Sequence, residues 1–172
     1  MGGGRQDGSW HDQTAFSHAP EMVEESERAT AESLLQSLLI GRGIYGLRFR
    51  AGMALLLWHA DLREPLEVEF TVGGPWRLDS PGGPLDGAWR DLDDEGYVSL
   101  AEFVGRCRSI EVVAVRLTGD ADLTLTFADG HRLTAAALDR YESWEVDGGP
   151  YKVLSLPGRD VAWWTNLDHR SA

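Results

Sequence analysis

The first strong hydrophobic pattern in the chain is helical and begins at Pro20. Apolar residues recur at the i, i+3, i+4 and i+7 spacing of one helix face: Ala31, Leu34, Leu35 and Leu38. Proline suits the first position of a helix, and the glutamates that follow lie where the helix dipole favours negative charge. Gly41 is a typical residue at a helix end. The pattern predicts an amphipathic helix over 20–41, and only its leucine-rich second half has an apolar face to bury.

After Gly43 the pattern changes to short runs in which apolar and polar residues alternate with the period of a β-strand. The clearest runs are 66–72 and 123–127, each with one apolar and one polar face. Asp129-Gly130 predicts a tight hairpin, because both central residues of a type I′ turn need positive φ. The predicted strands are 44–50, 53–59, 66–72, 76–79, 110–117, 123–127, 132–136, 142–146, 151–156 and 161–164.

These elements predict an α+β fold built on a meandering antiparallel sheet, because strands with one wet face are typical of antiparallel sheets. One further short helix is expected around 100–106. The pattern leaves open whether the sheet closes into a barrel. Residues 1–19 show neither period and are expected to form a mobile tail. The predicted organisation is therefore a tail over 1–19, a helix over 20–41 and one β-rich domain over 43–172.

Composition and charge narrow the classes of function. The chain has 172 residues, 42% of them hydrophobic, and a formal net charge of -12. Such a charge repels nucleic acid and anionic lipid, so neither is expected as a partner. The apolar runs are far shorter than the ~20 residues that span a bilayer, and the first residues show no secretory pattern. We therefore expect a cytoplasmic protein.

One stretch resembles a metal site in its spacing of oxygen donors. Residues 91–102 match the EF-hand calcium loop, and the donors would be Asp91, Asp93, Glu95, the Tyr97 carbonyl, Ser99 and Glu102. The proline- and glycine-rich residues before the loop cannot form the entering helix of an EF-hand. Ser99 and Glu102 also match a capping box, which needs no metal. The sequence favours a capped helix start, with calcium as the alternative and no other cofactor.

The C-terminal third resembles an uncharacterised family of small actinobacterial domains. The resemblance rests on the Asp129-Gly130 hairpin, on Tyr141-Glu142-x-Trp144, and on Pro157-Gly158 followed by Val161-Ala162-Trp163. It extends more weakly back to Gly43. Arg159 stands where the family pattern has a second glycine. The resemblance implies one domain with an antiparallel sheet and no assigned activity.

Acidic and tryptophan residues are the candidate partner-binding groups: Glu67, Glu69, Glu142, Trp144, Glu145, Trp163 and Trp164. Trp144 has a second interpretation, which we favour, as a core residue whose indole N–H donates to Glu142. Trp163 and Trp164 point to opposite faces of one strand, so one of them must leave the main core. An exposed tryptophan near a sheet edge indicates a partner surface or a homodimer contact.

Three functions follow from these observations. The first is a non-enzymatic acidic protein-binding domain, such as an immunity- or antitoxin-like neutraliser of a basic partner, for example a toxin. The alternative is a cation-modulated or small-ligand binding module that uses the loop from Asp91 to Glu102. The third is an enzyme, although no complete catalytic set is recognisable. A toxin gene immediately upstream would favour the first function.

Overall fold

The computed structural model describes residues 20–49, 52–59, 67–88, 101, 103–105, 108 and 110–165. Within them the chain forms helix α1, a short helical turn at 101 and 103–105, and strands β1 to β11. The predicted tail over 1–19 lies outside the described residues.

Helix α1 spans Pro20–Leu39 and docks by its second half. Its buried side chains are Ala31, Leu35, Leu38 and Leu39, whereas residues 25–27 are exposed. The chain leaves the helix through Gly41, whose φ of +79° lies in the left-handed region that favours glycine. The Gly41 N–H then donates to the Val112 carbonyl at 2.9 Å. The amphipathic pattern therefore predicted both the helix and the half that packs.

Six antiparallel strands form one sheet in the order β1-β2-β3-β9-β10-β11. They are β1 (Gly43–Phe49), β2 (Met53–Trp58), β3 (Val68–Val72), β9 (Trp144–Gly148), β10 (Tyr151–Leu156) and β11 (Asp160–Thr165). The long-range pairing of β3 with β9 joins the two halves of the chain and sets Val72 opposite Trp144.

The hairpin that joins β10 to β11 contains Arg159, the residue at which the chain departs from the family pattern, and shows why that pattern has a glycine there. Gly158 has a φ of +86° and Arg159 a φ of +61°. Leu156 pairs with Asp160, so the loop has three residues, and two of them have a positive φ, which glycine adopts most easily. The Arg159 side chain forms an ion pair with Asp139 at 3.1 Å, so the strained position also anchors the turn to a neighbouring loop.

Five strands form the second sheet in the order β5-β4-β8-β7-β6. They are β4 (Pro75–Ser80), β5 (Gly83–Ala88), β6 (Val112–Leu117), β7 (Leu123–Phe127) and β8 (Arg132–Ala135). The predicted hairpin between β7 and β8 is confirmed, with Gly130 at a φ of +90°. The predicted type I′ turn is wrong, because Asp129 does not have the positive φ that such a turn needs at both central residues. Strand β5 was not predicted, because its sequence is rich in proline and glycine. Such residues are tolerated here because β5 is an edge strand that pairs only with β4 among the described strands.

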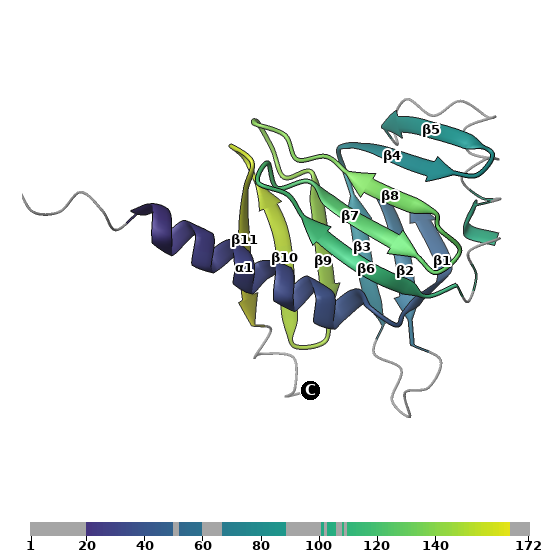
Figure 1. Ribbon diagram of the computed structural model, residues 1–172, viewed down its shortest axis with the longest axis horizontal. Coiled ribbons are helices and arrows are strands. Elements are labelled where there is room, and N and C mark those ends of the chain that lie inside the picture. Colours follow the sequence, from purple (N-terminus) through teal and green to yellow (C-terminus); the bar gives the residue numbers. More distant parts are fainter. Residues whose placement is uncertain are drawn as a thin grey trace, which may run out of the picture.

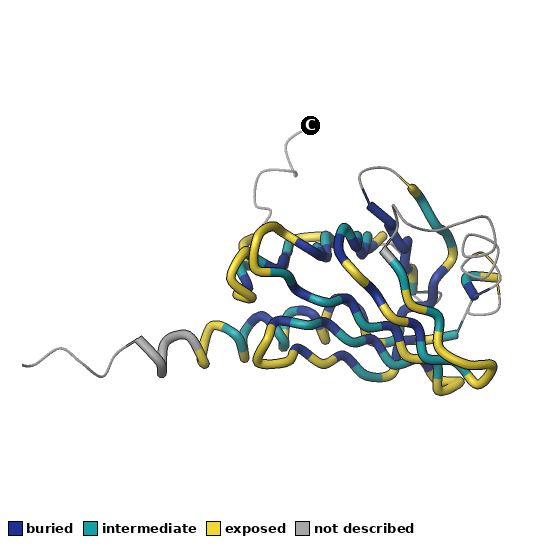
Figure 2. Tube along the Cα trace, turned by 90° about the horizontal axis from the view of Figure 1, so that it is seen from above, coloured by how far each residue is buried: buried dark blue, intermediate teal, exposed yellow. Residues whose placement is uncertain are grey.

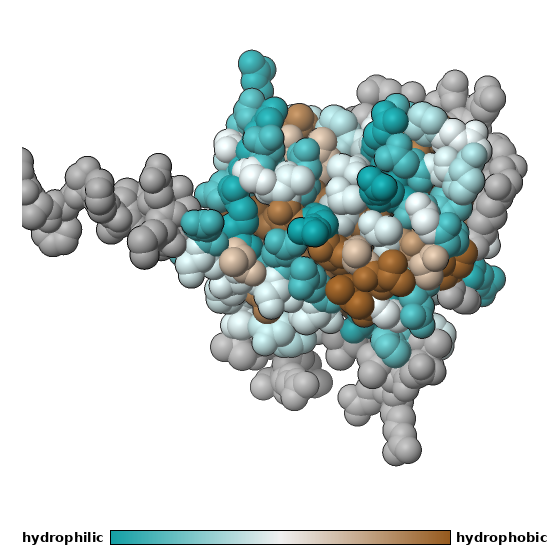
Figure 3. Space-filling view, viewed as in Figure 1, coloured by the Kyte–Doolittle hydropathy of each residue, from teal (hydrophilic) through white to brown (hydrophobic). Residues whose placement is uncertain are grey.

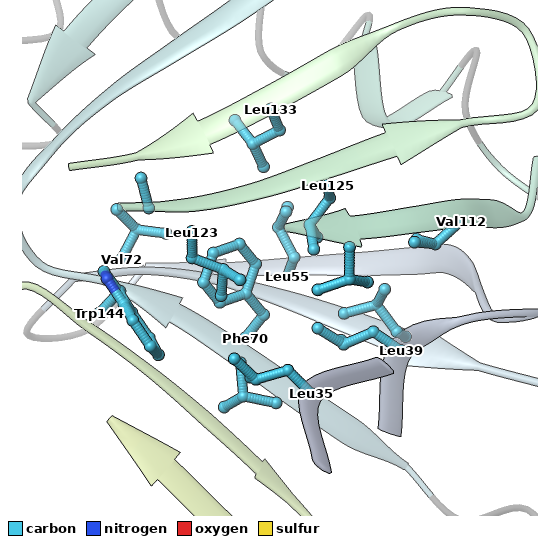
Figure 4. Close-up of a cluster of buried hydrophobic side chains, with 14 of the residues drawn as sticks. Leu35, Leu39, Leu55, Phe70, Val72, Val112, Leu123, Leu125, Leu133 and Trp144 are labelled. Atoms are coloured by element: carbon cyan, nitrogen blue, oxygen red, sulfur yellow. The ribbon is translucent and has the colours of Figure 1, made fainter. Parts of the chain in front are cut away.

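The two sheets pack face to face as two layers, which Figure 2 shows from above. Helix α1 runs beside β6 and continues the layer of the five-stranded sheet, so that it covers β10 and β11 (Figure 1). The core between the layers holds Phe70, Trp144 and leucines from both sheets and from α1 (Figure 4). The α+β antiparallel class is confirmed. The barrel alternative is wrong, since the strands divide into two open sheets rather than one closed sheet.

Candidate functional site

The outer face of the six-stranded sheet, which points away from the core, carries four acidic side chains. Glu69 on β3 is paired with Asp147 on β9, and Glu145 is paired with Thr71 in the next row. Glu67 precedes β3 and falls in the same alternation. The intervening residues of both strands are buried in the core. The structure therefore brings together Glu67, Glu69 and Glu145, three of the predicted residues, and adds Asp147.

Two cations on flanking strands partly neutralise these acids. Arg48 on β1 lies 3.5 Å from Glu67 and 3.2 Å from Glu69. Lys152 on β10 lies 2.7 Å from Glu145 and 3.7 Å from Asp147. Four carboxylates and two cations leave this face with a formal charge of about −2 at neutral pH. The sequence pattern indicated a more negative face, because it did not show that these two cations lie beside the acids.

The environment of Lys152 keeps this cation charged. Partial burial lowers the pKa of Lys152, but the hydrogen bond and the negative charge of Glu145, together with Asp147, outweigh it and raise the pKa overall. The ammonium also lies 5.8 Å from the ring centroid of Trp164 on β11, in a cation–π arrangement. Lys152 therefore links the acids to an exposed aromatic side chain.

Two more aromatic residues lie at the opposite end of the face. A bulge between Ile44 and Gly46 interrupts the pairing of β1 with β2 at Tyr45. The Tyr45 hydroxyl donates to the Glu67 carboxylate. Desolvation, followed by this hydrogen bond, raises the pKa of Tyr45 to about 12. Its ring meets Trp58 edge-on, with centroids 6.3 Å apart.

We call this surface the acidic-aromatic face. Its three aromatic side chains are 37–42% exposed, so each has a ring surface that a partner could cover. Its residues are Tyr45, Arg48, Trp58, Glu67, Glu69, Glu145, Asp147, Lys152 and Trp164. Sequence reasoning missed Tyr45 and Trp58 on this face, although both are large aromatic residues within predicted strands.

The structure separates three of the predicted residues from this face. Trp144 is only 2% exposed and its indole N–H donates to the Ala121 carbonyl at 2.8 Å. It therefore cannot contact a partner, and its acceptor is not Glu142. Glu142 is exposed but precedes β9 rather than lying in it. Trp163 points to the opposite side of β11 from Trp164, yet both are about 40% exposed because β11 is an edge strand.

The predicted calcium ligands Asp91, Asp93, Glu95, Tyr97, Ser99 and Glu102 lie outside the described residues. Among the residues that the structure describes, no group of three or more His, Cys, Asp or Glu side chains could hold a metal ion. No helix in the described ranges is long and apolar enough to cross a membrane.

A second polar pair lies at the Asp129-Gly130 turn. His131 Nδ1 lies 2.6 Å from Asp129 Oδ2, and Asp129 Oδ1 also accepts the His131 backbone N–H at 3.1 Å. The imidazole packs on Phe103, with ring centroids 5.7 Å apart. These contacts fix the turn against the short helical segment, which is a structural role.

A hollow of about 350 Å³ opens on the five-stranded sheet. Its lining residues are Pro75, Trp76, Arg77, Asp86, Gly87, Thr134 and Ala136. The charged groups in the lining are already satisfied, because Arg77 lies 2.8 Å from Asp79 and 3.4 Å from Asp86. The lining holds no histidine, cysteine or serine. Its polar side chains are Arg77, Asp86 and Thr134, and Arg77 and Asp86 are paired with each other.

The described part of the chain is thus a two-layer antiparallel β domain with one docked helix and an exposed acidic-aromatic sheet face. Residues 35–165, well over half of the chain, match the model of a family of unknown function, DUF6188, and the chain belongs to this family. No curated protein and no solved structure matches the chain.

Proposed function

We propose that this chain is a non-enzymatic protein-binding domain that holds a basic partner protein on its acidic-aromatic face. The observation that carries the proposal is the gathering of four carboxylates and three exposed aromatic rings on one sheet face. Protein interfaces are enriched in tryptophan, tyrosine and arginine, and large aromatic side chains dominate their binding energy. A sheet face whose strands are held by their pairing presents such groups with little ordering cost.

The ion pairs on the acidic-aromatic face determine which side chains of the partner can bind there. Arg48 and Lys152 each form ion pairs with two carboxylates. An Arg or Lys of the partner would therefore bind the carboxylate oxygens that these two cations leave unoccupied. A guanidinium suits this arrangement, because it donates to two oxygens in one plane and stacks on aromatic rings. We therefore propose that arginine side chains of the partner insert between the carboxylates and the rings of Trp58 and Trp164.

The biological setting follows from the chemistry of the partner. An immunity- or antitoxin-like neutraliser of a basic protein needs an acidic surface that covers it, because opposite charges steer the two surfaces together. We propose that this neutralisation takes place in the cytoplasm, and that the chain is of actinobacterial origin.

Co-expression tests the proposal at the level of the cell. The product of the adjacent upstream gene is expressed alone and together with the chain, and growth is measured. We expect growth arrest by the neighbour alone and rescue by the wild-type chain. Rescue should fail with Trp58→Ala plus Trp164→Ala, and should persist with Tyr141→Ala, which removes an aromatic residue that is 52% exposed outside the face. Equal rescue by all variants would contradict the proposed face.

Catalysis is the competing explanation of any rescue. A chain that rescues at far below stoichiometric amounts, and that modifies the neighbour covalently, would be an enzyme. Mass spectrometry of the neutralised protein distinguishes the two, since the proposal predicts an unmodified protein in a stable complex.

A further inference from the structure

One edge of the six-stranded sheet differs from the other sheet edges. In the described part of the chain, β11 (Asp160–Thr165) pairs only with β10. It is a regular strand without a bulge, and its sequence DVAWWT contains neither proline nor a basic residue. A regular, apolar edge strand is a template for pairing with another strand.

The three remaining edges carry features that block such pairing. Edge strand β6 lies beside α1, and hydrogen bonds from the Gly41 and Val112 N–H groups join the two segments. Strand β1 has a bulge and a bridge to Glu111 at its start. Strand β5 contains glycine and proline. Within the described residues three edges are thus protected and the β11 edge is exposed, which favours an occupant at that edge.

The helix gives a second indication at the same edge. The N-terminal half of α1 extends past β11 in Figure 1. Glu25, Ser26 and Glu27 in this part are exposed. The described buried side chains of α1 all lie in its second half, and in the first half Arg28 donates to the Gly119 carbonyl at 2.6 Å. A helical half with so few contacts has little stability of its own, because short helices are marginal in water. A sheet that continued beyond β11 would lie beneath this projecting half.

We propose that the chain forms a homodimer in which β11 pairs antiparallel with β11 of a second copy. The two six-stranded sheets would then form one continuous sheet, and each α1 would extend over the neighbouring copy. We centre the pairing on Ala162, so that Ala162 lies opposite Ala162 of the second copy and the paired segment runs from Asp160 to Trp164. In this register, residues that lie opposite each other point to the same face of the joined sheet.

The sequence of β11 is complementary to itself in this register. The smallest side chain, Ala162, meets its own copy at the two-fold axis. On the core side, Val161 lies opposite Trp163 of the second copy, which is a favourable β-branched and aromatic pair. On the outer side, Asp160 lies opposite Trp164 of the second copy, beside the cation of Lys152. A different protein would have to match this pattern, whereas a second copy matches it by symmetry.

The proposed interface also joins the two acidic-aromatic faces into one surface, since Trp164 lies at the rim of each. The strand pair alone is small, and specific dimers bury about 1,200 Å² or more. The projecting half of α1, about 15 Å long over ten residues, supplies the additional contact area.

Analytical ultracentrifugation of the full chain tests the proposal without any partner protein, so its outcome does not depend on the proposed function. We expect the mass of two chains at micromolar concentration. Ala162→Lys places two like charges at the two-fold axis and should raise the dimer dissociation constant at least about tenfold. Circular dichroism checks that this variant remains folded.

Val113→Lys is the matched control on edge strand β6. Figure 3 shows an apolar patch where α1 meets β6. Val113 is 51% exposed and Ile40 is 43% exposed, and the hydrogen bond between Gly41 and Val112 places both at this junction. We expect the control to dimerise like the wild type. A monomeric wild type, or a dimer that Val113→Lys dissociates and Ala162→Lys does not, would overturn the proposal.

Cross-linking tests the register even where the lysine variant fails to fold. Ala162→Cys in a Cys107→Ser background should give a disulfide-linked dimer on mild oxidation, because antiparallel partners have Cα atoms about 4.5–5.5 Å apart. Tyr141→Cys in the same background should remain monomeric on a non-reducing gel. Equal cross-linking of both variants, or none at Ala162→Cys, would contradict the pairing.

Discussion

Trp144→Phe should destabilise the fold by about 3 kcal/mol, far more than the same change at an exposed tryptophan. Trp144 is 2% exposed, and its indole N–H donates to the Ala121 carbonyl at 2.8 Å. Ala121 is itself fully buried and holds a positive φ of 59°. The hydrogen bond therefore fixes a strained residue in the loop before β7 and ties that loop to β9 of the other sheet.

The magnitude follows from two losses. Phenylalanine lacks the N–H group, so the Ala121 carbonyl stays buried without its partner, at a cost of about 1–3 kcal/mol. The smaller ring also lacks two ring carbons, and at about 0.8 kcal/mol per buried carbon group this removes about 1.5 kcal/mol. Partial collapse of the core around the smaller ring would reduce the second loss.

Urea unfolding followed by circular dichroism measures this change. Trp144→Phe should lower the midpoint with an unchanged m-value, because the native and unfolded surfaces stay similar. Trp164→Phe is the control, since that side chain is 41% exposed and should change stability by less than about 0.5 kcal/mol. Equal effects of the two substitutions would refute the role of the buried hydrogen bond.

Three further predictions test other parts of the structure. Ser155→Ala removes a fully buried hydroxyl that accepts two backbone N–H groups at 2.8 and 3.0 Å, and should cost about 2 kcal/mol in urea unfolding. Gly148→Ala would place a Cβ 2.6 Å from Val68 Cγ2 on the neighbouring strand, so it should destabilise by about 1–3 kcal/mol, seen as a lower melting temperature. Tyr45, whose pKa is raised from an ordinary value of 10.0 to about 12, should titrate above pH 10 by NMR, and Glu67→Gln should lower its pKa. Because its pKa is raised, the stabilising effect of Tyr45 is full below pH 10 and is lost as pH rises toward 12.

Local sequence patterns predicted the strands whose faces differ most in polarity. Strand β7 alternates leucine or phenylalanine with threonine, and its structure follows that alternation residue by residue. Strand β5 was not predicted, because its glycine and proline residues do not form an alternating apolar and polar pattern. The turn that leads from β4 to β5 is fixed by the Ser80 hydroxyl, which donates to the Gly83 carbonyl at 2.7 Å. No hydrophobic pattern in the sequence indicates this hydrogen bond.

The division into two sheets could not be predicted, because it depends on contacts between distant segments. Val72 pairs with Trp144, and Leu78 with Leu133, across long stretches of intervening chain. Any of several antiparallel orders would have satisfied the same alternation. The choice between them lies in the packing of the core, which no single strand encodes.

The site was predictable only in part, because local alternation shows which residues share a face of one strand but not which strands lie side by side. Alternation placed Glu67 and Glu69 on a polar face, and the structure agrees. It could not show that Arg48 and Lys152 flank them, since that depends on the order of β1, β3, β9 and β10. It also could not place Tyr45, because an unforeseen bulge interrupts the pairing there.

The association rate with the purified basic partner tests the central claim most directly. Glu67→Gln plus Glu69→Gln removes two acids that share Arg48 on the acidic-aromatic face. Asp79→Asn plus Asp86→Asn removes two acids that share Arg77 on the other sheet, and so changes the net charge equally.

Stopped-flow measurements at increasing salt compare these variants with the wild type. The account predicts that wild-type association slows as salt rises, that the Glu67 and Glu69 variant associates several-fold more slowly at low salt, and that the matched control stays near the wild type. Equal rates for both variants, or a wild-type rate that salt does not change, would contradict binding through the acidic-aromatic face.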